Sequence, residues 1–427
     1  MIPVLKTAAE WAAMNPTLDM GVFGMETDTG KMKRGDGVTS WVWLDDFAES
    51  MSARRLHSRY RPLRGIDSTV TSVVSAGDSK AATFIPFASA AGKYRFCGTT
   101  PHPFSGNAAW ALNNNNAFSE VFALQPIVIE FWSNATDLRV HGYQSGRGDY
   151  WALVGDMRVM PGWQHGNFDD GDFTWTLTQP SAVYRKWRLC VPAVFTGISV
   201  NSGATVVPTV ASGPQVAVVG DSVVQGNIAT ANSVAAGVTG MITSGAVFGE
   251  YEQITGVDVW RCGLGGTGYV AQSGDGPTSV YGSSTRVSRL AGMPAMDVVV
   301  AFGSANDGSA TAAAIVDAAN LAWSAIKAAQ PTAELVVVGM ECMGTPNADL
   351  DAKNTALVSA AKIHPAVSHV IDLRANSFIT GTGRDGAPAG NGNQDAFVST
   401  DGLHLTHPGH RYWGEQLAPL LGQARCR

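Results

Sequence analysis

The second half of the chain alternates short apolar runs with alanine-rich stretches, and this alternation restricts the folds open to it. Apolar runs of strand length occupy residues 216–219, 257–260, 296–302, 335–339 and 369–373. The stretches between them have helical composition, most clearly 310–329 and 350–362. Strands that alternate with helices form βαβ units and a parallel sheet. Right-handed crossovers then place helices on both faces, so we expect a three-layer α/β domain over residues 213–427.

Length and composition narrow the classes of protein. The 427 residues exceed one ordinary domain, and 45% hydrophobic content with 15% charged residues is typical of a globular protein. A net charge of −6 argues against nucleic acid or an anionic membrane as the main partner, because both attract basic surfaces. Five cysteines without a CxxC pair argue against a disulfide framework or zinc ribbon. The sequence shows neither an apolar run of transmembrane length nor the apolar core of a signal peptide at its start, so we expect a soluble chain without a leader.

Residues 66–212 follow a period of two. Alternating or apolar segments lie at 126–133, 137–144, 173–179 and 183–192, with turn-forming residues between them. Short strands separated by turns predict an antiparallel β-sandwich of the jelly-roll kind. The segment also contains tryptophans that could stack on sugar rings, although core packing is the better default: Trp132, Trp151, Trp163, Trp175 and Trp187. An arginine-rich stretch, 51–65, precedes it as a predicted basic linker.

Residues 1–50 combine many turn formers with interspersed tryptophans. They resemble a small module that recurs near the ends of bacteriophage tail-fibre and minor-tail proteins. The matching residues are Trp11, Asn15, Pro16, Leu18, Gly21, Gly24, Glu26, Thr27, Asp28, Thr29, Gly30, Lys33, Gly35, Asp36, Gly37, Thr39 and Trp41. The resemblance implies a virion protein that forms a homo-oligomer, such as a trimer, with other tail proteins as partners. The alternative is an arbitrary turn-rich extension, since so short a segment buries little core.

Polar and glycine-rich patches follow several of the predicted strands. Ser222 stands in the sequence GDS directly after the run 216–219, and we expect the patches 261–269, 302–308 and 400–411 each to fall just after a strand. The carboxyl ends of parallel strands meet at one edge of a sheet, where ligands bind. We therefore expect these patches to lie close together.

The residue types in these patches fit nucleophilic catalysis. A serine hydroxyl needs a base that is oriented by a third group. His404 can accept the proton of Ser222, and Asp401, three positions earlier, can fix the histidine tautomer. Attack on an ester also creates an oxyanion that needs prearranged donors. The backbone N–H groups of Ser222 and Gly266 and the amide of Asn306 are the candidates.

In order and spacing, these blocks resemble the SGNH or GDSL-type serine hydrolases across residues 214–427. The resemblance implies a flavodoxin-like sandwich, Ser222 as nucleophile, His404 as base and Asp401 as its orienting partner. It also implies an oxyanion hole formed by Ser222, Gly266 and Asn306. One departure is an extra residue between Gly303 and Asn306, which leaves Ser304 as an alternative donor. An all-β domain ahead of such a module also occurs in carbohydrate esterases of this kind.

Two patterns suggest other chemistry. The glycines from 263 to 268 fit GxGxxG, but the following stretch is rich in Gly and Ser and lacks helical character, so no dinucleotide site is expected. His404, His407 and His410 are spaced so that they diverge around Pro408 and Gly409, and we expect no metal. The resemblance to SGNH hydrolases likewise implies a site that acts on esters without a cofactor.

The leading hypothesis is a phage tail-associated esterase that removes acyl groups, O-acetyl above all, from a glycan or envelope component of the host cell surface. A virion protein released by lysis needs no signal peptide. One alternative is a lipase or thioesterase for longer chains, with the glycine- and asparagine-rich loop 381–393 setting acyl length. The other is a receptor-binding or structural tail protein with a vestigial hydrolase fold.

Overall fold

The computed structural model describes most of the chain. The described residues are 4–19, 22–28, 32–34, 40–41, 54–55, 65–87, 92–99, 101–104, 107–113, 126–144, 149–155, 157–160, 164–165, 171–191, 194–209, 213–228, 240–241, 246–274, 276–303, 305–340, 347–375, 377–422 and 425–426. Ser304 and Trp163, named above, lie outside them. Among the described residues, no helix combines the length and the apolar character that crossing a membrane requires.

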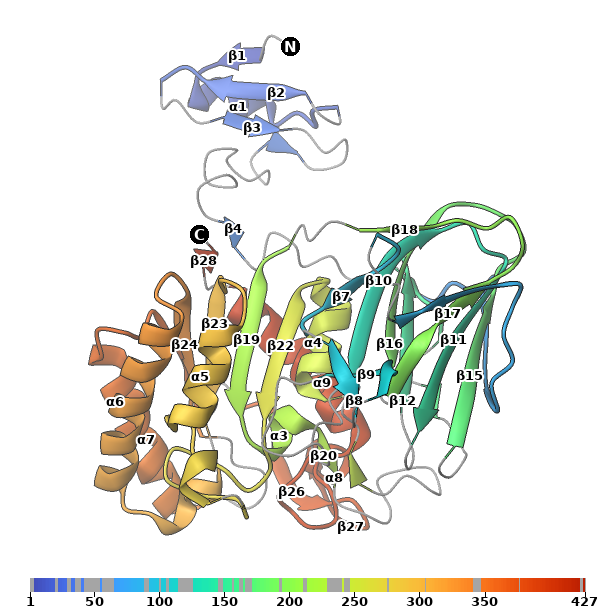
Figure 1. Cartoon of the computed structure of the whole chain (residues 1–427). Helices are drawn as coiled ribbons and strands as arrows, with labels where there is room; N and C mark the ends of the chain where they lie inside the picture. The colour runs from blue at the N-terminus through green and yellow to red at the C-terminus, as the bar shows by residue number, and fades with distance from the viewer. Residues whose placement is uncertain are drawn as a thin grey trace.

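A five-stranded parallel sheet forms the centre of the C-terminal part (Figure 1). Its strands, in spatial order, are β22 (Asp258–Gly263), β19 (Gln215–Gly220), β23 (Val298–Phe302), β24 (Glu334–Val338) and β25 (His369–Ile371). Every neighbouring pair is parallel. The chain starts at β19, moves to β22 on one side and then to β23 on the other. In such folds, ligands bind at the carboxyl ends of the strands, at the point where the strand order reverses.

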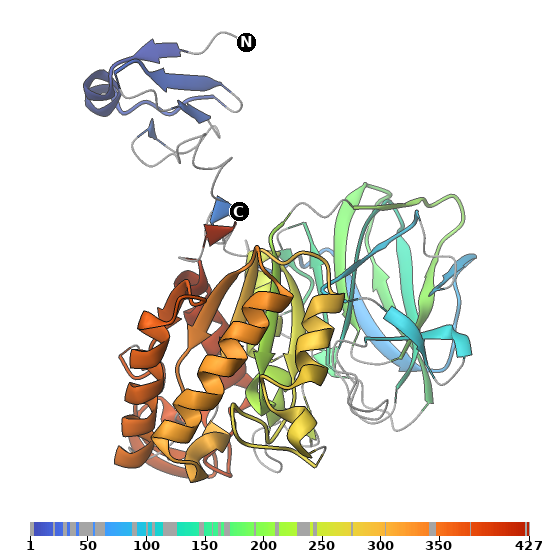
Figure 2. The same cartoon turned by 60° about the vertical axis from the view of Figure 1, so that its left-hand side comes forward.

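Helices cover both faces of this sheet. Helices α4 (Val247–Thr255) and α9 (His407–Leu421) pack on one face, where they share a core with Val216 and Val218. Helices α5 (Ser284–Gly292), α6 (Ala312–Ala329) and α7 (Ala348–Ile363) pack on the other face, seen from outside in Figure 2. Successive side chains of a strand point to opposite faces, so a strand covered on both sides needs a continuous apolar run. The predicted three-layer arrangement of the parallel sheet is therefore present.

The part before it consists of two antiparallel sheets that enclose a second core. One sheet follows the order β13 (Met157–Arg158), β12 (Asp149–Val154), β16 (Arg185–Val191), β10 (Ile127–Ser133) and β18 (Val206–Pro208), with β14 (Gln164–His165) and β7 (Arg95–Cys97) paired to it. The other follows β5 (Thr71–Ala76), β15 (Gly171–Thr178), β11 (Asp137–Gln144), β17 (Val194–Val200), β9 (Asn107–Asn113) and β8 (Pro101–Phe104), with β6 (Thr83–Pro86) paired to β17.

The tryptophans of the sandwich serve mainly as core. Trp151, Trp175 and Trp187 are fully buried, which agrees with the default interpretation from the sequence. Trp132 differs, because 44% of it is exposed on a strand that otherwise packs inward.

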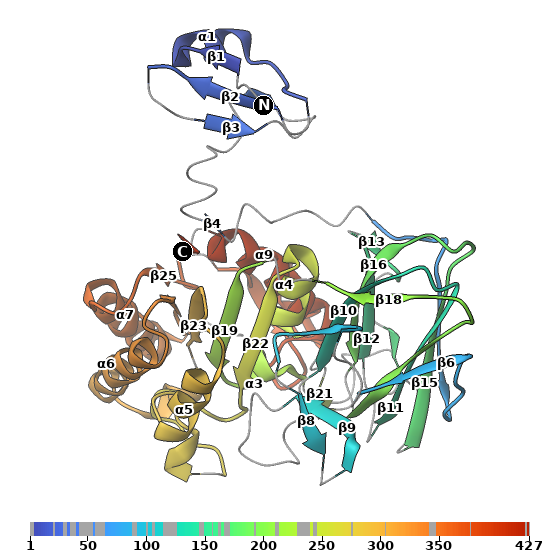
Figure 3. The ribbon, with the colours of Figure 1, turned by 45° about the horizontal axis from the view of Figure 1, so that its top comes forward.

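The N-terminal residues form a small unit with its own core, shown with its labels in Figure 3. Its elements are β1 (Val4–Lys6), α1 (Ala8–Met14), β2 (Phe23–Glu26) and β3 (Met32–Arg34). Thr7 and Glu10 form a capping box at the start of α1. Trp11 stacks on Trp41 with ring centroids 3.9 Å apart, and both are buried, so the segment buries more core than its length suggested. In the predicted linker, β4 (Arg54–Arg55) pairs with β28 (Arg425–Cys426).

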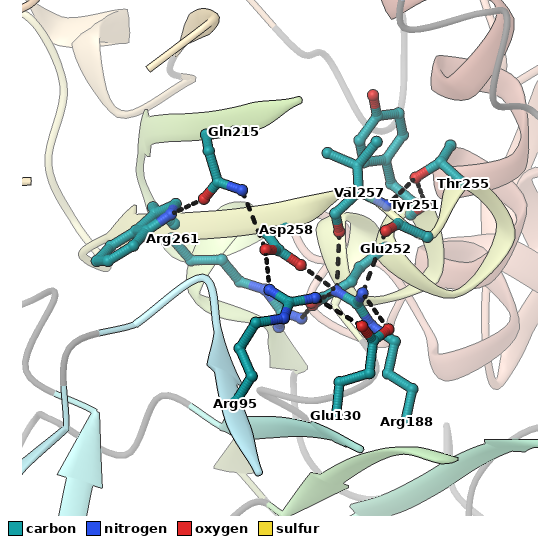
Figure 4. A network of polar contacts seen from close by, with 12 residues as sticks. Arg95, Glu130, Arg188, Gln215, Tyr251, Glu252, Thr255, Val257, Asp258 and Arg261 are labelled. Carbon is teal, nitrogen blue, oxygen red and sulfur yellow. Dashed lines mark hydrogen bonds and ion pairs between the residues drawn. The ribbon is translucent and has the colours of Figure 1, made fainter. Parts of the chain in front are cut away.

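The sandwich packs against β22, the edge strand of the parallel sheet. Figure 4 shows the buried charged network that joins the two parts at Asp258, the first residue of β22. Arg95 pairs with Asp258, and Arg188 bonds Asp258 and Glu252 at 3.1 and 2.6 Å. Glu130 of the sandwich binds Arg95 at 2.7 Å and Arg188 at 3.2 Å. The strand that leads into the glycine-rich loop is therefore anchored at its start, and an edge that could pair with another chain is covered.

Candidate active site

Ser222 occupies a tight turn at the end of the central strand β19. Asp221 caps the short helix α3 (Ser222–Gln225), and its Oδ1 accepts a hydrogen bond from the N–H of Val223 at 2.9 Å. Gly220 allows this turn, because a Cβ there would lie 2.2 Å from the Cγ2 atom of Val224. Ser222 is 6% exposed, so the surrounding chain covers most of this residue.

The structure brings His404 and Asp401 to this serine. The Nε2 atom of His404 lies 2.9 Å from the Oγ atom of Ser222, although the two residues are 182 positions apart. The Nδ1 atom of His404 lies 2.6 Å from the Oδ2 atom of Asp401. The other carboxylate oxygen of Asp401 accepts hydrogen bonds from the N–H groups of Leu403 and His404, at 2.9 and 3.0 Å. Backbone N–H groups of the turn thus hold the Asp401 carboxylate in place beside the His404 ring.

The surroundings of Asp401 favour its ionised form. Burial alone would raise the pKa of this carboxyl, but hydrogen bonds from the side chain and backbone of His404 lower it below its ordinary value. Helix α9 follows directly, capped by the hydroxyl of Thr406 with Pro408 in its first turn. The Asp401 carboxylate, which stays ionised, can fix the tautomer of the His404 imidazole and stabilise its protonated form.

Asn306 lies between the nucleophile turn and the glycine-rich loop. It stands in a short 3₁₀ helix (Ala305–Ser309) after β23. Its Nδ2 donates to the carbonyl oxygen of Thr267 at 3.1 Å and to Oδ2 of Asp221 at 3.3 Å. Gly266, in the same loop as Thr267, has a φ of +73°, a conformation that favours glycine. The amide of Asn306 therefore lies beside Asp221, the neighbour of Ser222, and its role as an oxyanion donor stays a prediction.

Asp307 is a site residue that the sequence interpretation missed. Its carboxylate accepts hydrogen bonds from the N–H groups of three successive loop residues, Tyr269, Val270 and Ala271, at 2.8, 2.9 and 2.7 Å. Burial raises the pKa of Asp307, and the three N–H donors offset only part of that effect. The loop passes so close that a Cβ at Gly268 would lie 2.4 Å from this carboxylate. The adjacent residues Asn306 and Asp307 thus both form hydrogen bonds with the glycine-rich loop. Their adjacency in the sequence was the one feature that could have predicted a role for Asp307.

Gln225 was also missed. Its Oε1 accepts a hydrogen bond from the N–H of Gly265 at 2.7 Å, which connects the end of α3 to the glycine-rich loop. No short motif marks a glutamine for such a role, since it depends on two loops meeting in space.

The GxGxxG pattern and the histidine series 404, 407 and 410 do not form a dinucleotide site or a metal site among the described residues. The loop after Gly263 leads to a 3₁₀ turn (Gly276–Ser279) and reaches α5 only at Ser284, whereas a dinucleotide fingerprint opens a helix directly. His407 begins α9, and His410 is completely buried in it. Within the described ranges, no group of three or more His, Cys, Asp or Glu side chains is placed to hold a metal ion.

The predicted loop 381–393 is a β-hairpin beside the turn that carries Asp401 and His404. Strands β26 (Gly381–Arg384) and β27 (Ala387–Gly392) pair antiparallel. The N–H of Asp385 donates to the carbonyl of Val398 at 2.8 Å, and Val398 bridges to Leu405. Figure 1 shows the hairpin at the same edge of the sheet as α3. The segment expected to be a loop is therefore a hairpin, whose register shifts between Thr382 and Gly383.

Comparison with solved structures identifies the fold. A GDSL-like lipase from Bacteroides ovatus is 13% identical, with a TM-score of 0.54, and covers 80% of this chain and 97% of its own. An acetyl xylan esterase from Butyrivibrio proteoclasticus is 12% identical, with a TM-score of 0.51 and coverages of 83% and 98%. A family two carbohydrate esterase from Cellvibrio japonicus is 13% identical, with a TM-score of 0.50 and the same two coverages, 83% and 98%.

At these identities the likeness shows the fold alone. No protein-family model matches the sequence, and no curated protein matches it significantly. The fold expected from the resemblance to GDSL-type hydrolases is confirmed, whereas the resemblance of residues 1–50 to tail proteins stays a prediction.

Proposed function

We propose that this chain is a serine esterase that hydrolyses ester-linked acyl groups through Ser222, His404 and Asp401. The observation that carries the proposal is the continuous hydrogen-bonded series from the Ser222 hydroxyl through the His404 ring to the Asp401 carboxylate, at 2.9 and 2.6 Å. Nucleophile, base and orienting group within hydrogen-bond reach are the general signature of an activated hydroxyl.

The geometry supports a two-step acyl transfer. In the first step, Nε2 of His404 takes the proton of Ser222 while Oγ forms a bond to the acyl carbon, and the carbonyl oxygen becomes an oxyanion. The C–O bond to the alcohol then breaks, and His404 returns the proton to the leaving oxygen. In the second step, water repeats the sequence on the acyl-enzyme, and the carboxylic acid leaves. The N–H groups of Ser222 and Gly266 stabilise both oxyanions, and the amide of Asn306 joins them by exchanging its 3.3 Å bond to Asp221 for the substrate oxygen, so the reaction needs no cofactor.

Acylated glycans are the substrate class that we favour, with O-acetyl as the acyl group. The support is the shared fold with an acetyl xylan esterase and a family two carbohydrate esterase over more than four fifths of this chain, sandwich included. A lipase or thioesterase acting on longer chains is the second candidate, because the GDSL-like lipase shares the fold equally well. The hairpin 381–392, next to the turn that carries Asp401 and His404, is the element that would limit acyl length.

We further propose that the enzyme is a phage tail component that acts at the host cell surface as part of a homo-oligomer. The support is the sequence resemblance of residues 1–50, in which two of the matching residues, Trp11 and Trp41, form the buried stack of the N-terminal unit. A binding protein with an inactive hydrolase fold is the rival, and the intact triad geometry argues against it.

A comparison of two substrates tests the proposal. The wild-type protein should hydrolyse p-nitrophenyl acetate faster than p-nitrophenyl octanoate and should release acetate from an O-acetylated polysaccharide. Ser222→Ala should remove both activities while leaving the thermal unfolding temperature and adsorption to host cells unchanged. Preference for octanoate would favour the lipase candidate. Absence of hydrolysis from any ester by a folded wild type would favour the binding protein.

A further inference from the structure

Arg286 is a buried arginine whose side chain reaches the two strands that deliver the nucleophile and the glycine-rich loop. It stands in the first turn of α5 and is 2% exposed. Its Nη2 atom donates to the carbonyl oxygens of Gly220 and Cys262, at 2.8 and 2.6 Å. These residues lie at the carboxyl ends of β19 and β22. One nitrogen thus connects the ends of the two strands that precede Ser222 and Gly266 in the sequence.

The second terminal nitrogen reaches the loop itself. Nη1 lies 3.3 Å from the Oγ1 atom of Thr267 and 3.3 Å from the carbonyl oxygen of Ser279. The Thr267 hydroxyl donates to the carbonyl of Leu264 at 2.6 Å, while its own carbonyl accepts from Nδ2 of Asn306 at 3.1 Å. Arg286 is therefore connected, through one threonine, to the amide of the expected oxyanion hole.

Burial of this side chain is costly, which argues that the contacts matter. Burial lowers the pKa of Arg286, because the charged form loses hydration, and the nearby groups Tyr281, Cys262 and Asp221 offset part of this effect. The guanidinium also lies over the ring of Tyr281, with its Cζ atom 5.0 Å from the ring centroid. Only a planar group with several fixed donors can bond carbonyls of two strands and a loop at once, and the lysine ammonium lacks this geometry.

We propose that Arg286 is a positioning residue of the esterase site, which holds the ends of β19 and β22 and the glycine-rich loop in register so that the N–H groups of Ser222 and Gly266 and the amide of Asn306 converge on one oxyanion. This inference rests on the proposed function. It predicts an effect on turnover, because the oxyanion exists in the transition state and not in the bound ester. A displacement of these donors by about 1 Å costs roughly 100-fold in rate.

The experiment compares three variants on p-nitrophenyl acetate. Arg286→Met removes all donors but keeps an unbranched side chain, and Arg286→Lys keeps the charge and part of the donor set. Arg289→Met is the matched control, because Arg289 lies one turn later on the same helix, is only partly buried and makes none of these contacts. We expect kcat to fall about 100-fold in Arg286→Met with KM within about twofold, partial recovery in Arg286→Lys, and wild-type values in Arg289→Met.

Each result decides the inference. A folded Arg286→Met protein with wild-type kcat, or one that changes only KM, overturns it. If Arg286→Met does not fold, Arg286→Lys decides, since a folded lysine variant with wild-type kcat also overturns it. If the wild type hydrolyses no ester, the proposed function fails by itself. The rate at which a fluorophosphonate labels Ser222 then replaces turnover: slower labelling of the folded variant supports positioning by Arg286, and equal or absent labelling refutes it.

Discussion

Arg188→Met tests whether the buried charged network determines the stability of the protein. In the wild type, the Arg188 guanidinium donates to Glu252, Asp258 and Glu130 at 2.6, 3.1 and 3.2 Å, and to the carbonyls of Gly256 and Val257 at 3.1 and 3.0 Å. Methionine fills much of the volume but leaves these oxygens without their common partner. Such a change is costly because it leaves uncompensated buried charge.

The expected loss of unfolding free energy depends on the partners that the three carboxylates keep when Arg188 is removed. Removing one partner of a buried pair typically costs about 3–5 kcal/mol. Glu130 and Asp258 keep Arg95, and Glu252 keeps Arg261 at 3.0 Å, so we expect a value near the lower limit, about 3 kcal/mol. For domains of this size, that loss corresponds to a decrease in Tm of roughly 6–12 °C.

Differential scanning calorimetry of the whole chain measures the effect. The control is Lys186→Met on the same strand, because Lys186 pairs with Glu130 at 2.9 Å but its side chain is 37% exposed. Partly exposed pairs contribute at most about 1 kcal/mol, so its Tm should change little. Equal Tm values for Arg188→Met and the wild type would refute the reasoning. A decrease in Tm of the same size in Lys186→Met would show that the buried Arg188 contributes no more to stability than a partly exposed ion pair.

Two further predictions concern the triad and the sandwich. Asp401→Asn should lower kcat on p-nitrophenyl acetate by about 1,000-fold or more with little change in KM, because the amide favours the wrong His404 tautomer; a decrease below tenfold in steady-state assays would show that the carboxylate is dispensable. His141 is buried beside Asp78, Lys80 and Arg139, and burial, partly offset by Asp78, lowers its pKa to about 4. The unfolded chain therefore binds this proton first, and the free energy of unfolding should fall by about 3 kcal/mol as the pH decreases from 6.5 to about 4. Denaturant titrations across this range should show a flatter pH dependence in His141→Gln, and an unchanged slope would contradict the assignment.

The sequence predicted the parts of the fold that depend on local pattern. The continuous apolar runs around Val216 and Val298 predicted buried parallel strands, and helix α6 begins within two residues of its expected start. The order of the short blocks predicted that Ser222, His404 and Asp401 would meet, and the structure brings them within hydrogen-bond distance. Their catalytic roles stay predictions, because geometry alone does not measure turnover.

The missed features share a different physical origin. Asp307 and Gln225 accept hydrogen bonds from N–H groups of the glycine-rich loop, and Arg286 donates to carbonyls at the ends of β19 and β22. These contacts join segments far apart in the sequence, and only the adjacency of Asp307 to Asn306 was a local signal for one of them. Because glycine and asparagine weaken the usual strand pattern, the Gly and Asn content of residues 381–393 predicts a loop, whereas the structure forms a hairpin there. Ion pairs across the domain boundary, such as Arg188 with Glu252, likewise depend on packing that only the folded chain defines.

Strand β22 connects the charged network at the sandwich with the glycine-rich loop and Arg286. It starts at Asp258 within the charged network of the sandwich and ends at Gly263, where the loop that carries Gly266 begins. Arg261, in the middle of the strand, bonds Glu252 of α4 at 3.0 Å, and Arg286 holds the carbonyl of Cys262 at the far end. An edge strand has a neighbour on one side only, so its position depends on whatever covers the other side. The sandwich supplies that cover, which gives it a physical reason to accompany the hydrolase fold even if it binds no substrate.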